Sequence, residues 1–123
     1  MRLTGRAGLV LAIIATGGGC RRAPPTSLVA GGDAARGRQA IAAYGCGACH
    51  VVPGVRQALG MVGPPLTAFG RRAYIAGEAP NTARSLIQWI MSPQSIEPGT
   101  AMPALGVSEA QARDIAAYLY TLR

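Results

Sequence analysis

The 123-residue sequence contains no lysine, a single histidine (His50), and only one tryptophan and one phenylalanine. All twelve basic residues are arginine, and with five acidic residues they give a net charge of +7. Aromatic residues make up 5% of the chain, so large side chains are scarce and we expect a bound group to complete the core. The length allows one domain and excludes a large multidomain enzyme.

Residues 1–19 have the pattern of an export signal. Arg2 and Arg6 precede an apolar run at residues 9–15. This run is shorter than the roughly 20 apolar residues that a membrane-spanning helix needs. We therefore expect the mature protein on the periplasmic side of a bacterial membrane.

Cys20 follows three glycines, and its position resembles the lipid-attachment cysteine of bacterial lipoproteins. The alternative is ordinary signal cleavage, which would leave no lipid. Residues 20–32 contain Pro24-Pro25 and Gly31-Gly32 and are predicted to form a flexible tether to a domain at 33–123. A lipid on Cys20 would hold that domain at the membrane surface.

Three helices are predicted within residues 33–123. Asp33 caps the first, which continues to residue 44, and Gly37 inside it suggests close approach of another helix. Ser108 and Gln111 form a capping-box pattern at the start of the last helix.

The middle helix follows Pro80, with Asn81 as its cap and Pro93 at its end. A shorter helical piece is possible at 67–76. No stretch alternates cleanly enough to predict a strand, so the fold class is all-α.

The segment Cys46-Gly47-Ala48-Cys49-His50 has the C-x-x-C-H pattern of covalent haem attachment. Two thiols three residues apart lie on one helical turn, so each can add to one vinyl group of a haem. His50 then lies beneath the iron and can supply an axial nitrogen. A zinc site would need a fourth ligand, a thioredoxin-like dithiol would need a βαβ context, and a disulfide would leave His50 unexplained.

The sixth iron ligand cannot be a second histidine, because the chain has only one. Met91 lies on the apolar face of a predicted helix, where core packing explains it. Met61 follows His50 by eleven residues, on the same side of the haem. Met102 lies in a loop between two helices and is the favoured ligand. The alternative is a surface methionine at 102 and an iron open to water or small ligands.

Residues 33–123 resemble the class I, or mitochondrial-like, c-type cytochromes. Besides the C-x-x-C-H segment, three stretches are similar to family segments: Gly63-Pro64-Pro65-Leu66, Phe69-Gly70-Arg71 and Pro98-Gly99-Thr100-Ala101-Met102. The resemblance implies a class I cytochrome c fold, in which three main helices and short helical pieces surround one covalent haem c.

The resemblance also implies roles outside the C-x-x-C-H segment. The Pro64 carbonyl would accept a hydrogen bond from the ligand imidazole, which fixes the ring and raises its basicity. Arg71 and Thr100 would contact haem propionates, and Trp89 would replace a tyrosine that packs near the haem. The apolar lining is expected to come from Val51, Leu66, Phe69, Leu86, Trp89, Ile90, Leu105 and Leu119.

These features predict a monomeric electron carrier rather than an enzyme. One electron would pass by outer-sphere transfer to or from a membrane oxidoreductase, such as a terminal oxidase or a periplasmic dehydrogenase. The alternative is a haem peroxidase or a small-ligand-binding cytochrome with an open iron position.

The positive charge does not indicate nucleic-acid binding, because the arginines are scattered and no aromatic-basic platform exists. Residues 33–123 hold eight arginines and five acids, so their charge is +3. This charge favours mild attraction to an acidic redox partner. The lysines that ring the haem edge of mitochondrial family members are missing, so recognition through that ring is not expected.

Overall fold

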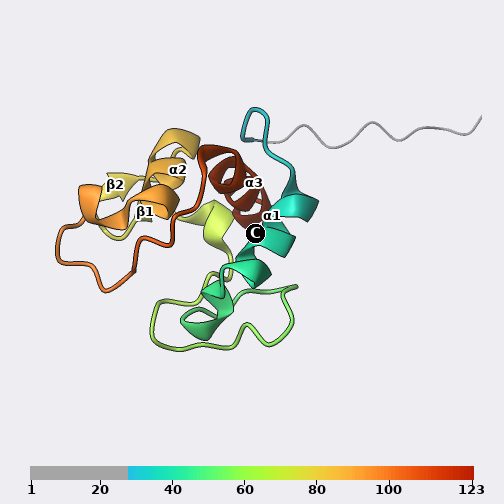
Figure 1. Ribbon diagram of the computed structural model, residues 1–123. Helices are drawn as coiled ribbons and strands as arrows, with labels where there is room; N and C mark the ends of the chain where they lie inside the picture. Colours follow the sequence, from blue (N-terminus) through green and yellow to red (C-terminus); the bar gives the residue numbers. More distant parts are fainter. Residues whose placement is uncertain (1–27) are drawn as a thin grey trace, which may run out of the picture.

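Figure 1 shows the computed structural model, which describes residues 28–123. Three α-helices are joined by long loops: α1 (Ala34–Ala43), α2 (Ala83–Met91) and α3 (Glu109–Leu119). Three single 3-10 turns lie within the loops: η1 (Cys46–Ala48), η2 (Phe69–Arg71) and η3 (Pro93–Ser95). The only sheet in this part of the chain is a short antiparallel hairpin of β1 (Tyr74–Ile75) and β2 (Ala79–Pro80). The predicted all-α class with three main helices is confirmed.

The predicted export signal at 1–19 and the predicted lipid site at Cys20 lie outside the described residues. Within residues 28–123, no helix combines the length and the apolar character needed to cross a membrane.

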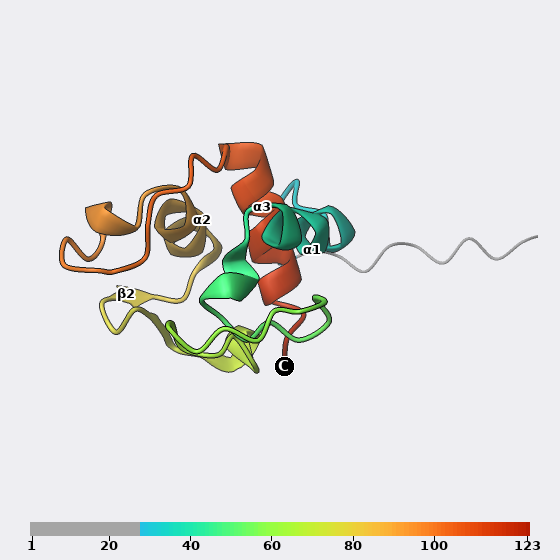
Figure 2. The same cartoon turned by 60° about the horizontal axis from the view of Figure 1, so that its bottom comes forward.

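Helices α1 and α3 cross at the centre of the fold, with α2 packed on another side of α3 (Figure 2). The crossing is tightest at Gly37, where a Cβ atom would lie 1.9 Å from the main-chain oxygen of Asp114. Only glycine lets the two backbones come this close. The close helix approach predicted from Gly37 is confirmed.

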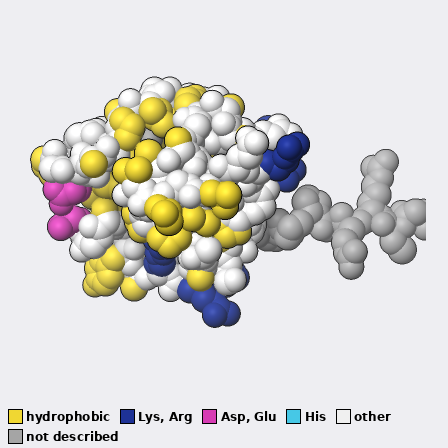
Figure 3. Space-filling view, turned by 90° about the horizontal axis from the view of Figure 1, so that it is seen from below, with side chains coloured by type: hydrophobic (Ala, Val, Ile, Leu, Met, Phe, Trp, Pro, Cys, Tyr) yellow, Lys and Arg dark blue, Asp and Glu magenta, His cyan; other side chains and the backbone are white. Residues whose placement is uncertain are grey.

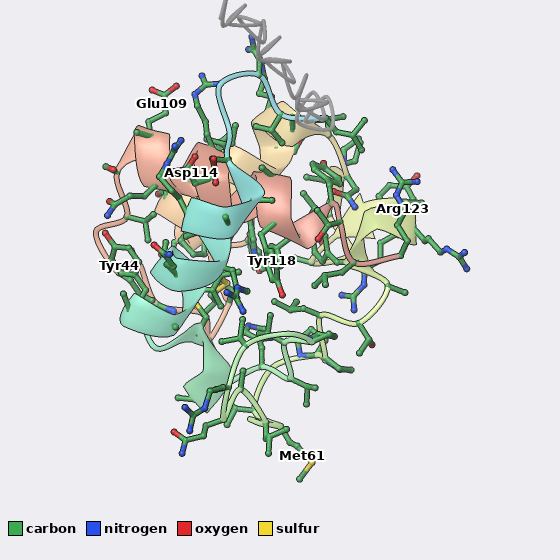
Figure 4. All side chains as sticks on the ribbon, turned by 90° about the vertical axis from the view of Figure 1, so that its right-hand side faces the viewer. Tyr44, Met61, Glu109, Asp114, Tyr118 and Arg123 are labelled. Atoms are coloured by element: carbon green, nitrogen blue, oxygen red, sulfur yellow. The ribbon has the colours of Figure 1, made fainter. Side chains whose placement is uncertain are left out.

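The buried carboxylate of Asp114 ties the start of α1 to α3 (Figure 4). It accepts a hydrogen bond from the Asp33 main-chain N–H at 2.7 Å and two from the Arg36 guanidinium at 2.8 and 2.9 Å. The hydrogen bond from Arg36 is the main cause that holds the pKa of Asp114 below its ordinary value, whereas burial acts in the opposite direction. The ionised carboxylate therefore stabilises the helix crossing.

We expect the stability that Asp114 contributes to be present at neutral pH and lost in acid. The pKa of its carboxyl is lower in the folded chain than in the unfolded chain. The contribution is thus complete above the unfolded value of about 3.9 and disappears as the pH falls through the folded value. Asp114→Asn should lower the free energy of unfolding by about 1.5–3 kcal/mol at neutral pH, and by much less near pH 2.

Denaturant titrations of both proteins at the two pH values test this expectation. Glu109→Gln is the matched control, because it removes an exposed ion pair with Arg113 on the same helix. That change should cost less than about 0.5 kcal/mol. An Asp114→Asn effect of the same size at both pH values would contradict the role of the ionised carboxylate.

The helix starts follow the sequence prediction at α1 and α3 but not at α2. Asp33 caps α1, and Ser108 forms the predicted capping box with Gln111. Helix α2 is capped by Thr82, so the prediction of Asn81 was wrong. The Asn81 amide instead donates to main-chain oxygens at the η2 turn, a contact that sequence spacing does not reveal.

Only one turn of the helical piece considered at 67–76 is formed, the 3-10 turn η2. One turn of η2 is followed by the hairpin, and Ala76 (φ 53°) and Gly77 (φ 77°) have left-handed conformations at its tip. These two residues cannot continue a helix. The strands of two residues each are too short to produce an alternating pattern, which is why the sequence showed no strand.

Residues 28–32, which the sequence places in the tether, pack against the domain. Val29 is buried in the core. Gly32 is so close to α3 that a Cβ atom would lie 2.6 Å from the main-chain oxygen of Arg113. The packed part of the chain therefore begins a few residues before Asp33.

Candidate functional site

A cavity of about 770 Å³ lies between the three helices and the loops that connect them. Pockets of roughly 300–1,000 Å³ hold small molecules and cofactors in proteins. All the apolar side chains expected to line it do so except Val51, which instead forms an isolated β-bridge with Leu59. The interior thus has room for the bound group that the scarcity of aromatic residues predicts.

The C-x-x-C-H segment forms one wall of this cavity, directly after α1. Gly45 adopts a left-handed conformation (φ 69°) that turns the chain from α1 into η1. The His50 main-chain N–H donates to the Cys46 oxygen at 3.0 Å, so a single turn carries all three functional side chains. Cys46, Cys49 and His50 all line the cavity. No disulfide joins the two thiols, and burial raises the pKa of the Cys46 thiol, which keeps it protonated at neutral pH.

The imidazole of His50 is oriented by the Pro64 carbonyl, whose oxygen lies 2.7 Å from Nδ1. A carbonyl oxygen can only accept a hydrogen bond, so Nδ1 carries the proton. The lone pair of Nε2 is then free to bind a metal ion. An outer hydrogen bond of this kind fixes the tautomer and orientation of a ligating histidine.

Gly63 forms a wall behind the same imidazole. A Cβ atom at Gly63 would lie 2.3 Å from Cε1 of His50 and 2.7 Å from its Nδ1. The Gly63 main-chain N–H donates to the Cys49 oxygen at 2.8 Å, so the glycine cannot easily move away. The ring is therefore held from behind by Gly63 and at its edge by Pro64.

We expect Gly63→Ala to displace the imidazole and break its hydrogen bond to Pro64. Overpacking of this kind costs about 1–3 kcal/mol. The yield of haem-loaded protein and its free energy of unfolding should both fall. Gly99→Ala is the control, because its Cβ would meet only a flexible Glu97 carboxylate oxygen, at 3.2 Å. Equal behaviour of the two variants would contradict this role of Gly63.

Trp89 from α2, and Thr100 and Met102 from the loop before α3, also line the cavity. The Met102 main-chain N–H donates to the Thr100 hydroxyl at 3.2 Å. Among the methionines of residues 28–123, Met102 alone reaches this cavity. Met61 is 89% exposed at the end of its loop (Figure 4), and Met91 lines a separate groove.

The structure places Arg72, and not the predicted Arg71, at the cavity. Arg71 is exposed and is not part of the lining. The Arg72 guanidinium lies over the Phe69 ring, with Cζ 5.3 Å from its centroid, and donates to the Pro65 main-chain oxygen. The η2 turn ends between the two arginines and directs only the second one inward.

The rim of the cavity is largely apolar. Val62, Tyr74 and Leu105 line the cavity and are also exposed. Arg72 and Glu97 are the only acidic or arginine side chains that contribute to the lining in the described part of the chain. Figure 3 looks from the side of the 51–66 loop and shows hydrophobic side chains gathered on this face, with arginines toward its margin.

The residues present fit a haem better than a metal ion alone. The cavity combines two thiols and an imidazole on one turn, a thioether from a distant loop, and apolar walls. Within residues 28–123, no three His, Cys, Asp or Glu side chains are grouped so that they could hold a metal ion. A porphyrin would supply the remaining iron ligands and fill the apolar space.

Comparisons with known proteins agree with this chemistry. The family model described as Cytochrome c matches residues 34–123. Cytochrome c oxidase subunit 2 of Alkalihalophilus pseudofirmus is 40% identical over 89 residues, which is 72% of this chain and 25% of that protein. The chain thus spans about a quarter of the length of this curated relative. With its haem-attachment turn, its three-helix fold and this match, the chain belongs to the cytochrome c family, whose members bind haem c covalently and transfer electrons.

Proposed function

We propose that the protein is a single-haem electron carrier whose iron is ligated by His50 and Met102. The observation that carries the proposal is that these two side chains, from distant parts of the sequence, line one cavity. A histidine and methionine pair raises the reduction potential relative to two histidines. With both ligands in place the iron has no open position, which favours electron transfer over peroxidase or small-ligand chemistry.

Bound haem c supplies the one-electron chemistry, and the chain supplies attachment, orientation and exclusion of water. Cys46 and Cys49 would hold the porphyrin through thioether bonds. The Pro64 carbonyl orients His50 and raises its basicity as a ligand. The apolar walls disfavour the additional positive charge of ferric iron. Arg72, which lines the cavity and lies over Phe69, would meet a haem propionate.

We further propose a membrane terminal oxidase as the redox partner. The similar protein in Alkalihalophilus pseudofirmus is named as an oxidase subunit. The apolar rim suits close contact with a partner, and the charge of +3 on residues 33–123 gives mild electrostatic steering. A periplasmic dehydrogenase is the alternative partner. The rate at which a terminal oxidase oxidises the reduced protein tests the first partner. The rate at which a dehydrogenase reduces the oxidised protein tests the second.

We also propose that the protein is exported and carries a lipid on Cys20. A lipid there would keep the electron carrier beside a membrane oxidase. Mass spectrometry of the mature N-terminus tests this, because lipidation predicts an acylated Cys20 as the first residue. An unmodified Cys20 in the exported protein would contradict it.

The spectrum of the exported, purified protein tests the proposed ligation. We expect one iron per chain and a pigment that stays with the protein in acidic organic solvent. The ferric form should show the sulfur-to-iron absorption band, and the ferrous form should not bind carbon monoxide. A colourless protein would overturn haem attachment. Strong carbon monoxide binding by the unmutated ferrous protein would favour a peroxidase or small-ligand-binding role instead.

A further inference from the structure

We propose that Gln94 is a positioning residue that holds Met102 in the cavity and sets how readily the sixth iron position opens. The inference rests on the proposed ligation by Met102. The side-chain amide of Gln94 donates a hydrogen bond to the Met102 main-chain oxygen at 2.8 Å. This bond connects the residue that bears the thioether directly to the turn at the end of α2.

Within the described chain, the Gln94 amide makes the only hydrogen bond that joins residues 101–107 directly to η3. Residues 101–107, drawn in orange before α3 in Figure 1, make no backbone–backbone hydrogen bond. The Met102 main-chain N–H donates to Thr100, which belongs to the same loop. Most of the segment is exposed, and Val107 is its only buried residue. Apart from packing and the local bond to Thr100, which is linked to η3 through Glu97, the Gln94 amide is thus the one hydrogen bond that holds this segment.

Gln94 lies on η3, a turn that is held in place by burial and hydrogen bonds. It is the middle residue of η3, whose first residue, Pro93, is buried. The Ser95 hydroxyl donates to the Ser92 main-chain oxygen at 2.7 Å and accepts from the Gln88 amide of α2 at 3.1 Å. The donor is therefore fixed relative to α2, and movement of the Met102 backbone away from η3 must break its bond.

Loss of this bond is expected to favour the open form of the loop. A hydrogen bond contributes about 1 kcal/mol, which corresponds to about a fivefold change in an equilibrium constant. An added ligand can bind the iron only after Met102 has left, so its apparent affinity scales with the open fraction. Imidazole should therefore bind the ferric form of Gln94→Ala about fivefold more tightly than it binds the unmutated protein.

The experiment titrates imidazole into ferric haem-loaded protein and follows the sulfur-to-iron band. Gln94→Ala and Gln94→Glu both remove the N–H donor, so both should bind imidazole at least about fivefold more tightly. Gln94→Arg restores an N–H donor of similar reach and should return to within about twofold. Gln88→Ala is the matched comparison: Gln88 is an exposed glutamine that bonds Ser95 and makes no hydrogen bond to the loop. Its removal loosens η3 but keeps the Gln94 donor, so its gain in imidazole affinity should be clearly smaller than that of Gln94→Ala.

The outcomes separate this inference from the proposed ligation. If the unmutated ferric protein lacks the sulfur-to-iron band, the ligation by Met102 fails, and the role of Gln94 fails with it. If the band is present but Gln94→Ala binds imidazole as the unmutated protein does, only the role of Gln94 is overturned. An equal gain in Gln88→Ala would also overturn it, because general loosening of the α2 end would then be the cause. Gln94 is exposed, so these variants leave the core intact.

Discussion

Gly37→Ala is expected to destabilise the protein strongly, although alanine is the better helix former. In an open helix position the change would stabilise by about 1 kcal/mol. Here the new Cβ atom would lie 1.9 Å from the main-chain oxygen of Asp114 and 2.9 Å from the main-chain nitrogen of Ile115. Both are backbone atoms of α3, so no side chain can rotate away and the two helices must separate.

Because the clash is with backbone atoms, overpacking here should reach or exceed the upper end of the usual cost of about 1–3 kcal/mol. After the gain of about 1 kcal/mol in helix propensity, the net loss should be about 2 kcal/mol. For a domain of this size that lowers Tm by roughly 8–16 °C. Thermal unfolding of the haem-loaded protein, followed by circular dichroism, measures the effect. Ala42→Gly, at an exposed position of α1, is the control and should cost only about 1 kcal/mol. A Gly37→Ala protein more stable than the unmutated one would contradict the tight crossing.

Met102→Ala is expected to abolish the sulfur-to-iron absorption band and to open the iron to carbon monoxide in the ferrous form. Removal of the thioether also removes a ligand that favours ferrous iron. The reduction potential should therefore fall by on the order of 0.1 V or more, since axial ligands set haem potentials over a range of about 0.8 V. Absorption spectroscopy and a redox titration of the purified variant measure both effects.

Two other methionines provide matched controls. Met61 is exposed and Met91 lines a separate groove, so Met61→Ala and Met91→Ala should retain the band and exclude carbon monoxide. Loss of the band in Met61→Ala, with its retention in Met102→Ala, would identify Met61 as the sixth ligand and contradict the proposal. Retention of the band in all three variants would show that none of these three methionines is the required ligand, and would contradict the proposal.

The features predicted best from the sequence are those that depend on neighbouring residues. The C-x-x-C-H segment carries both thiols and the imidazole on one turn, and the cap formed by Ser108 and Gln111 spans one helical turn. Gly37 was also informative, because an interior helical glycine indicates close packing. These signals come from residues that are close in sequence, and the packing of the folded chain agrees with them.

Two predictions failed where adjacent residues were chemically equivalent. Asn81 and Thr82 are both good helix caps, and the choice was made by η2, which takes the Asn81 amide. Arg71 and Arg72 can both meet a propionate, and the end of η2 decides which one faces the cavity. Nothing in the sequence around Gln94 indicated its bond to Met102, because an exposed glutamine in a loop has many possible partners.

The sequence by itself determined the C-x-x-C-H haem-attachment pattern, the helical class and the choice of His50 as the candidate iron ligand, because each depends on residue types at fixed short spacing. Only the tertiary structure decided that Gly63 braces His50, that Arg72 reaches the cavity and that Gln94 holds the Met102 loop. These contacts join separate turns and loops of the chain. Their geometry depends on how those segments pack, and that packing cannot be inferred from the spacing of neighbouring residues.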